Sequence, residues 1–199
     1  MKKNNIMRAV AWSLASVVLG GALVYYNFIY QPPTTPFAIG EECPDFTAKQ
    51  VAYNGTKWED TGETFSLSDY KGKVVIVNFW ATWCADCVKE LPDFDRVYKE
   101  YSDEVELLAV ADKSDSMSYM VRWLNGEGWK SHSPNSDWKP FTFTIGQNDQ
   151  EDLFSRLGGS GAIPRTVIVD KNGVAVAEAN KLNYEELKAL IEPYLSAEE

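Results

Sequence analysis

Residues 74–87, VVIVNFWATWCADC, constrain the fold of this chain more than any other segment. Residues 74–80 are almost unbroken in apolar and β-branched side chains, which predicts a strand covered on both faces. A tight turn follows, and Cys84 and Cys87 stand at the predicted start of a helix. Unpaired N–H groups and the helix dipole stabilise a thiolate at such a position. The pattern therefore predicts a redox-active C-x-x-C pair between a strand and a helix.

The residues that follow Cys84 predict a long amphipathic helix. Apolar side chains recur at spacings of three and four residues, which places them on one helix face. Pro92 lies inside this segment and is expected to kink the helix, because a proline removes one backbone hydrogen bond. The apolar stripe consists of Cys87, Leu91, Phe94, Val97, Tyr98 and Tyr101.

The composition limits the classes of protein that this chain can represent. Its 199 residues, 45% of them hydrophobic and 24% charged, fit one globular domain with an additional segment. The formal net charge of −10 argues against nucleic acid as a partner and against peripheral binding to anionic lipid. Three cysteines are too few for a small protein held together by disulfides.

The N-terminal region predicts a membrane anchor. Residues 1–8 contain two lysines and one arginine, and residues 9–30 form an uncharged, mostly apolar run long enough for a transmembrane helix. Basic residues before the span predict a cytoplasmic N-terminus, so the catalytic domain is expected outside the cytoplasm, in the periplasm or on the outer surface. Residues 31–36, QPPTTP, form a short stiff linker, and residues 37–199 form the exported domain.

A cleaved signal peptide is the alternative to an uncleaved anchor. Residues 20–22, Gly-Gly-Ala, provide a small-residue cleavage site after an apolar segment. The apolar run continues beyond that site, which favours the anchor. Both interpretations predict an exported domain.

Strand and helix patterns alternate through residues 37–199, which predicts a mixed α/β sheet with helices on both faces. Asn54-Gly55 marks a turn between the first two strands, and Asn183 with Glu186 forms a capping box for the last helix. The predicted strands are 46–53, 63–67, 74–80, 105–111, 141–145, 165–170 and 174–178, and further helices are predicted at 117–124, at 149–157 and from 183 to about 195.

Four segments in combination resemble a known family. They are CPDF at 43–46, SLSDYKGK at 66–73, GKVVIVNFWATWCADCVKELP at 72–92 and GAIPRTVIVDKNGV at 161–174. With these segments the exported domain resembles the thioredoxin fold and, more narrowly, the membrane-anchored TlpA/ResA-like thiol-disulfide oxidoreductases of bacteria. The resemblance covers nearly the whole of that domain.

The resemblance implies further features of the fold and the site. It implies a thioredoxin-like domain with an N-terminal β-hairpin extension, and an inserted strand–helix element for which residues 112–150 have room. It also implies a cis peptide bond between Ile163 and Pro164 beside the two cysteines, where the backbone would offer hydrogen bonds to an extended substrate. No cofactor is implied beyond the redox-active Cys84–Cys87 disulfide.

The predicted reaction is thiol–disulfide exchange through a mixed disulfide. Cys84 is expected to attack or be attacked, Cys87 to resolve the mixed disulfide, and Pro164 to shape the substrate groove. Trp83 and Trp80 are expected to flank the cysteines and limit water. The alternative for the cysteine pair is a static disulfide in an exported domain.

The acid–base partner of the cysteines is the main departure from the family pattern. Thioredoxin has a buried acid in the strand before the motif, where this chain has Asn78. ResA-like proteins often carry Glu after the first cysteine, where this chain has Ala85. Asp86 and Glu90 are the candidates, and Asp86 is also expected to raise the pKa of Cys84. Their alternatives are a helix-dipole role for Asp86 and a solvated helix face for Glu90.

Several other side chains have a structural and a functional interpretation. Cys43 is expected to be a buried small apolar residue, with an intermolecular disulfide as the alternative. His132 is the only histidine and is expected at the surface, which weakens any metal-site interpretation. The aromatic residues between 119 and 143 are expected to pack in the core and loops, with a partner-docking patch as the alternative. They are Tyr119, Trp123, Trp129, Trp138, Phe141 and Phe143.

The resemblance implies a membrane-tethered disulfide reductase. It would take electrons from a membrane thiol carrier resembling CcdA/DsbD and pass them to an exported protein, as relatives do for apocytochrome c. The alternatives are a disulfide oxidase or isomerase, a peroxiredoxin-like peroxidase, and a non-catalytic metal carrier or structural ectodomain.

Overall fold

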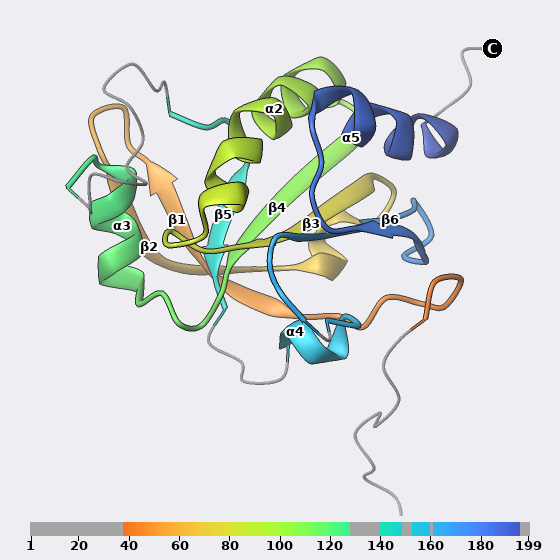
Figure 1. Cartoon of the computed structure of the whole chain (residues 1–199), viewed down its shortest axis with the longest axis horizontal. Coiled ribbons are helices and arrows are strands. Elements are labelled where there is room, and N and C mark those ends of the chain that lie inside the picture. The colour runs from red at the N-terminus through yellow and green to blue at the C-terminus, as the bar shows by residue number, and fades with distance from the viewer. Residues whose placement is uncertain (1–37, 128–139, 149–152, 160, 196–199) are drawn as a thin grey trace, which may run out of the picture. The chain divides into compact units, whose positions relative to one another are not determined.

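A mixed sheet of seven strands positions the cysteine motif (Figure 1). The computed structural model describes residues 38–127, 140–148, 153–159 and 161–195. Within them the strand order is β2-β1-β5-β4-β3-β6-β7; the β3–β4 and β4–β5 pairs are parallel and the other pairs are antiparallel. The strands are β1 Thr47–Tyr53, β2 Trp58–Ser66, β3 Val74–Trp80, β4 Val105–Ala111, β5 Thr144–Gln147, β6 Arg165–Val169 and β7 Ala175–Ala179.

Strand β3 is buried along its whole length, as its apolar sequence predicts. Because side chains alternate along a strand, Ile76 and Trp80 belong to one hydrophobic cluster, and Val77 and Phe79 belong to a second cluster across the sheet. The sheet is therefore covered on both faces. This burial holds the C-terminal end of β3, and the cysteine turn after it, in a fixed place.

Helices cover the two faces of the sheet unequally. Helices α2 (Ala85–Tyr101) and α5 (Tyr184–Ile191) lie over one face, and the short helix α4 (Leu153–Arg156) lies over the other (Figure 1). Pro92 lies inside α2, and the helix axis bends along its length in Figure 1. The helices on both faces and the thioredoxin-like arrangement agree with the sequence prediction.

The predicted N-terminal hairpin is present, but its second strand was predicted too short. Strand β2 begins at Trp58 rather than at residue 63, and Leu67 opens the 3-10 helix Leu67–Tyr70. The middle of β2 is exposed because it lies at the sheet edge, so it lacks the alternating pattern that identifies a half-buried strand. The predicted turn is confirmed, with Asn54 Oδ1 accepting from the N–H groups of Thr56 and Lys57.

The region between β4 and β6 holds the additional elements that the resemblance implies. Helix α3 (Met117–Leu124) matches its prediction, and β5 occupies residues 144–147 instead of 141–145. Phe141 and Phe143 instead stack on each other, with ring centroids 5.0 Å apart, and are buried just before the strand. The Asn125 side chain joins α3 to the hairpin, since it bonds both the N–H and the carbonyl of Trp58.

The last third of the chain follows its prediction with shifted boundaries. Helix α4 covers less than residues 149–157, of which 149–152 lie outside the described residues. The capping box of Asn183 and Glu186 is present, but α5 ends at Ile191 and continues as the 3-10 helix Glu192–Tyr194. Pro193 explains this early end, because it has no N–H to donate to the preceding turn.

The predicted anchor at residues 9–30 and the linker at 31–36 lie outside the described residues. Among the residues that the structure describes, no helix is both long and apolar enough to cross a membrane.

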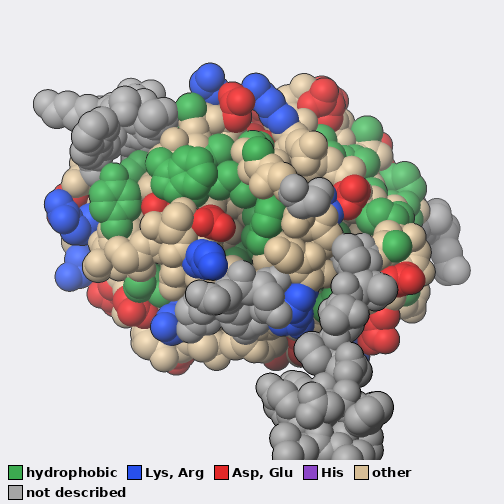
Figure 2. All heavy atoms as spheres, turned by 60° about the horizontal axis from the view of Figure 1, so that its bottom comes forward, with side chains coloured by type: hydrophobic (Ala, Val, Ile, Leu, Met, Phe, Trp, Pro, Cys, Tyr) green, Lys and Arg blue, Asp and Glu red, His purple; other side chains and the backbone are tan. Residues whose placement is uncertain are grey.

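On the face shown in Figure 2, acidic and basic side chains are interspersed, and hydrophobic side chains gather over part of it.

Candidate active site

The two cysteines meet at the start of α2 in a disulfide. Their Cα atoms lie 5.3 Å apart, and Cys84 is the N-cap residue of the helix. The backbone N–H of Cys87 donates to Sγ of Cys84 at 3.2 Å. Cys84 is 8% exposed and Cys87 is 0% exposed. The first sulfur is therefore the more accessible of the two, and it is the one that receives the helix N-terminal amide.

The loop before β6 brings Ile163 and Pro164 to the cysteines. The peptide bond between them is cis, as the resemblance implies. The carbonyl oxygen of Ile163 lies 3.7 Å from Sγ of Cys84, although 79 residues separate them in sequence. Pro164 is buried, and Ile163 is half-buried. The predicted meeting of the C-x-x-C motif with the Ile-Pro loop is thus confirmed.

The turn between β3 and α2 is held by a residue that sequence reasoning missed. The buried carboxylate of Asp115 accepts from the N–H of Thr82 at 2.6 Å and from its hydroxyl at 2.8 Å. The Gln147 side chain donates to the carbonyl of Asp115 at 3.1 Å. These bonds connect the cysteine turn to the α3–β5 region. Asp115 directly precedes the Ser116 N-cap of α3, so its local sequence predicts only a helix start.

The two tryptophans near the motif have different environments. Trp83 is 56% exposed, and its Nε1 donates to the Ser114 hydroxyl at 2.9 Å. Trp80 is 0% exposed and packs against Trp123, with ring centroids 5.5 Å apart. Trp83 therefore presents an apolar surface beside Cys84, whereas Trp80 belongs to the core beneath the turn.

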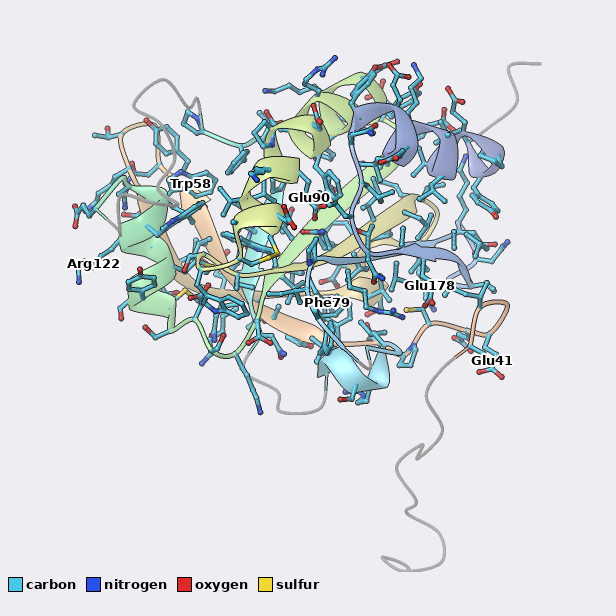
Figure 3. All side chains as sticks on the ribbon, viewed as in Figure 1. Glu41, Trp58, Phe79, Glu90, Arg122 and Glu178 are labelled. Carbon is cyan, nitrogen blue, oxygen red and sulfur yellow. A yellow bond between two sulfur atoms is a disulfide. The ribbon has the colours of Figure 1, made fainter. Side chains whose placement is uncertain are left out.

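Glu90 is buried, which rules out the alternative that it lies on a solvated helix face. It is 3% exposed, and one oxygen accepts from Asn78 Nδ2 at 2.9 Å while the other accepts from the Leu182 N–H at 3.3 Å. Glu90 lies one helical turn after Cys87, near the disulfide in Figure 3. Burial raises the pKa of Glu90 to about 7, although the two hydrogen bonds oppose the shift.

Asn78 therefore contributes to the site, although it replaces an acid. Its buried amide nitrogen donates to Glu90 and, at 3.1 Å, to the Thr166 hydroxyl. A buried carboxyl group therefore lies beside Asn78, but it comes from α2 and not from β3. Sequence reasoning identified both residues but could not pair them, because their contact depends on how α2 crosses the sheet.

Asp86 lies in the first turn of α2 and pairs with two lysines. Lys181 Nζ is 2.9 Å from Oδ1 of Asp86, and Lys89 Nζ is 3.8 Å from the same oxygen. The hydrogen bond from Lys181, supported by its positive charge, lowers the pKa of Asp86. Asp86 is thus held ionised and partly neutralised by Lys181, a partner that the local sequence does not indicate.

Cys43 and three of the aromatic residues lie in the core, whereas His132 and two further tryptophans lie outside the described residues. Cys43 is buried, as predicted, and burial with the nearby Asp45 charge raises the pKa of its thiol to about 12. Trp123, Phe141 and Phe143 are buried in the core, as predicted. The predictions for His132, Trp129 and Trp138 concern residues outside the described ranges.

The geometry defines a class of protein. A thioredoxin-like sheet carries a C-x-x-C disulfide at a helix start, facing a cis-proline loop, which is the arrangement of a thiol-disulfide oxidoreductase. The crystal structure of the thioredoxin domain of a thiol-disulfide oxidoreductase from Bacteroides vulgatus superimposes on this chain with a TM-score of 0.59 at 21% identity. The match covers 80% of this chain and 99% of that one. This likeness supports the fold.

Sequence comparison gives the family. The sequence model of the AhpC/TSA family matches residues 39–177. The thiol-disulfide oxidoreductase ResA of Geobacillus thermodenitrificans is 32% identical over 176 residues, which is 87% of this chain and 86% of that protein. ResA of Bacillus thuringiensis is 28% identical over 200 residues, covering 98% and 97%. The chain therefore belongs to the AhpC/TSA family and to the thiol-disulfide oxidoreductases of the ResA type.

Glu90 makes the stability of the oxidised protein depend on pH. Its pKa rises from 4.5 to about 7 on folding, so the folded protein binds this proton more tightly. The contribution of protonated Glu90 to the free energy of unfolding is present in full below about pH 4 and is lost as the pH rises through 7. Relative to Glu90→Gln, the unaltered protein should lose on the order of 3 kcal/mol of unfolding free energy between pH 4 and pH 8.

Urea denaturation of both proteins at each pH measures this difference. The exposed glutamate of β2 provides a control for the loss of one carboxylate, as Glu63→Gln. If the free energy of unfolding changed with pH to the same extent in the unaltered protein and in Glu90→Gln, the raised pKa of Glu90 would be contradicted.

Proposed function

We propose that this oxidoreductase is an extracytoplasmic disulfide reductase that acts on exported proteins. The observation that carries the proposal is the Cys84–Cys87 disulfide at the start of α2, with the Ile163 carbonyl 3.7 Å from the more accessible sulfur. Residues 9–30 are proposed to tether the protein to the membrane. The similarity to proteins named ResA supports the class of reaction.

The proposed cycle begins with the reduced protein. The Cys84 thiolate, stabilised by the α2 N-terminus, attacks a substrate disulfide and forms a mixed disulfide while one substrate sulfur leaves. Cys87 then loses its proton and attacks Sγ of Cys84. The Cys84–Cys87 bond forms, the second substrate sulfur leaves, and two electrons have passed to the substrate.

Glu90 is proposed as the acid–base partner of Cys87. The carboxyl group lies one helical turn away in a buried site, and a pKa of about 7 allows it to accept and release a proton near neutral pH. A membrane thiol carrier resembling CcdA/DsbD is proposed to reduce the disulfide again. Apocytochrome c, whose haem-attaching cysteines must be reduced, is one proposed substrate.

Trapping and a reduction potential test the reaction and its direction. Cys87→Ser should accumulate a mixed disulfide on Cys84, and Cys84→Ser should abolish reduction of a disulfide-bonded apocytochrome c peptide. Cys43→Ala, which removes the buried third thiol, should leave the rate unchanged. A reductase should have a potential near that of thioredoxin, about −270 mV, whereas a value near −120 mV would indicate an oxidase.

Three other results would contradict the proposal. Reshuffling of scrambled disulfides without net reduction would favour an isomerase. Turnover of peroxide would favour a peroxidase. Tight stoichiometric metal binding under anaerobic conditions, lost in Cys84→Ser, would favour a metal carrier.

Asp86 is proposed to favour the reductase direction. A negative charge near Cys84 destabilises its thiolate, and a less stable thiolate makes the protein a weaker oxidant. Asp86→Asn should therefore make the potential less negative by about 10 to 30 mV, which is up to a tenfold change in the exchange equilibrium.

Lys181 provides the matched control for Asp86. Because its charge opposes that of Asp86, Lys181→Met should move the potential in the opposite direction. An unchanged or more negative potential in Asp86→Asn would rule out tuning by this carboxylate.

A further inference from the structure

A polar cavity of about 410 Å³ adjoins the cis-proline loop. Its walls include Ile163 and Pro164 from the loop, Arg165 at the start of β6 and Glu178 near the end of β7. Ile163 is also the residue whose carbonyl lies 3.7 Å from Sγ of Cys84. One residue therefore borders both the reactive sulfur and this cavity.

Arg165 is buried with its hydrogen bonds incomplete. The residue is 8% exposed, and Nη2 donates to the Leu157 carbonyl at 3.1 Å and to Glu178. The buried Nε of Arg165 has no partner among the residues that the structure describes. Nε is itself shielded from solvent, so a molecule in the cavity meets the terminal nitrogens of the guanidinium, where an acceptor would form a charge-assisted hydrogen bond.

Glu178 gives the cavity an acceptor beside this donor. The residue is exposed, and it is labelled on β7 in Figure 3. One carboxylate oxygen bonds Arg165, and a carboxylate has acceptor capacity beyond one bond. The two charges cancel, so the cavity attracts neither an isolated carboxylate nor an isolated ammonium group strongly. It offers a donor and an acceptor side by side.

A primary carboxamide has the complementary arrangement. Its carbonyl accepts and its NH₂ group donates along the same edge, whereas a trans peptide group presents these functions on opposite sides. Asn and Gln are the side chains with this group. The adjacent donor and acceptor in the cavity therefore match an Asn or Gln side chain of the substrate.

The position of that residue follows from the geometry of an extended chain. Ile163 borders both Sγ of Cys84 and the cavity, so an extended substrate joined to that sulfur would pass over Ile163 and Pro164 to reach the cavity. An extended chain advances about 3.3 Å per residue and alternates its side chains, so residues two apart face the same side. The residue two positions from the substrate cysteine would then face the protein at the cavity.

We propose that the Arg165–Glu178 cavity is a substrate subsite that binds an Asn or Gln side chain two residues from the reacting cysteine. This inference rests on the proposed function, because it concerns the substrate of the same exchange reaction. Arg165 donates to the carboxamide oxygen, and Glu178 accepts from the carboxamide nitrogen.

Disulfide-linked peptides that differ at one position test the subsite. The reduced full chain is mixed with peptides carrying Gln, Glu, Lys or Leu two residues before or after the cysteine, and the second-order rate of exchange is measured. In one of the two placements the Gln peptide should react about three- to tenfold faster than the other three. Arg165→Gln should abolish this preference.

A charge-altering variant separates recognition from a loss of stability. Glu178→Gln leaves the guanidinium without its anion, so the fastest peptide should change from Gln to Glu. Glu100→Gln removes a carboxylate that pairs with Lys188 at the other end of α2, and it should keep the Gln preference. A change of preference, unlike a general loss of rate, is not produced by partial unfolding.

The outcomes distinguish this inference from the function on which it rests. If no peptide exchanges with the protein, the proposed function fails. If all four exchange within twofold of one another in both placements, or if Glu, Lys or Leu is preferred by the unaltered protein, the function stands and the subsite is refuted.

Discussion

The hydrogen bond from the N–H of Cys87 to Sγ of Cys84 is the contact on which the site depends. It exists because Cys84 caps α2, so the sulfur occupies the place that a Ser or Asp oxygen takes in other helices. The same amide and the same helix end stabilise a thiolate when the disulfide opens. The buried strand β3 and the Asp115–Thr82 bonds hold this cap in register with the Ile163 loop.

The two carboxyl groups near the cysteines, those of Glu90 and Asp86, lie at different depths below the surface. Glu90 is held below the surface by Asn78 and by the Leu182 amide, and its burial raises its pKa towards neutrality. Asp86 lies nearer the solvent, where Lys181 keeps it ionised. One carboxyl group can therefore exchange a proton near neutral pH, while the other acts as a fixed charge beside the first cysteine.

Sequence patterns predicted the parts of the molecule that local chemistry determines. The apolar run of β3 and the stripe along α2 located the central strand, the helix and the cysteine cap. The burial of Glu90 was not predictable, because it depends on Leu182, 92 residues away, and on the way α2 crosses the sheet. Asp115 was missed for a similar reason, since its partner Thr82 lies 33 residues earlier. The edge strand β2 was misjudged because its exposed middle lacks an alternating pattern.

Alkylation of the reduced protein, resolved by residue, tests the central claim most directly. With a limiting amount of iodoacetamide at pH 7, mass spectrometry should find the label on Cys84, because this sulfur is the more accessible and receives the helix amide. Cys87 and Cys43 should remain unlabelled while the protein is folded, and both should react in urea. Labelling of Cys87 at a rate equal to or above that of Cys84 would contradict the account.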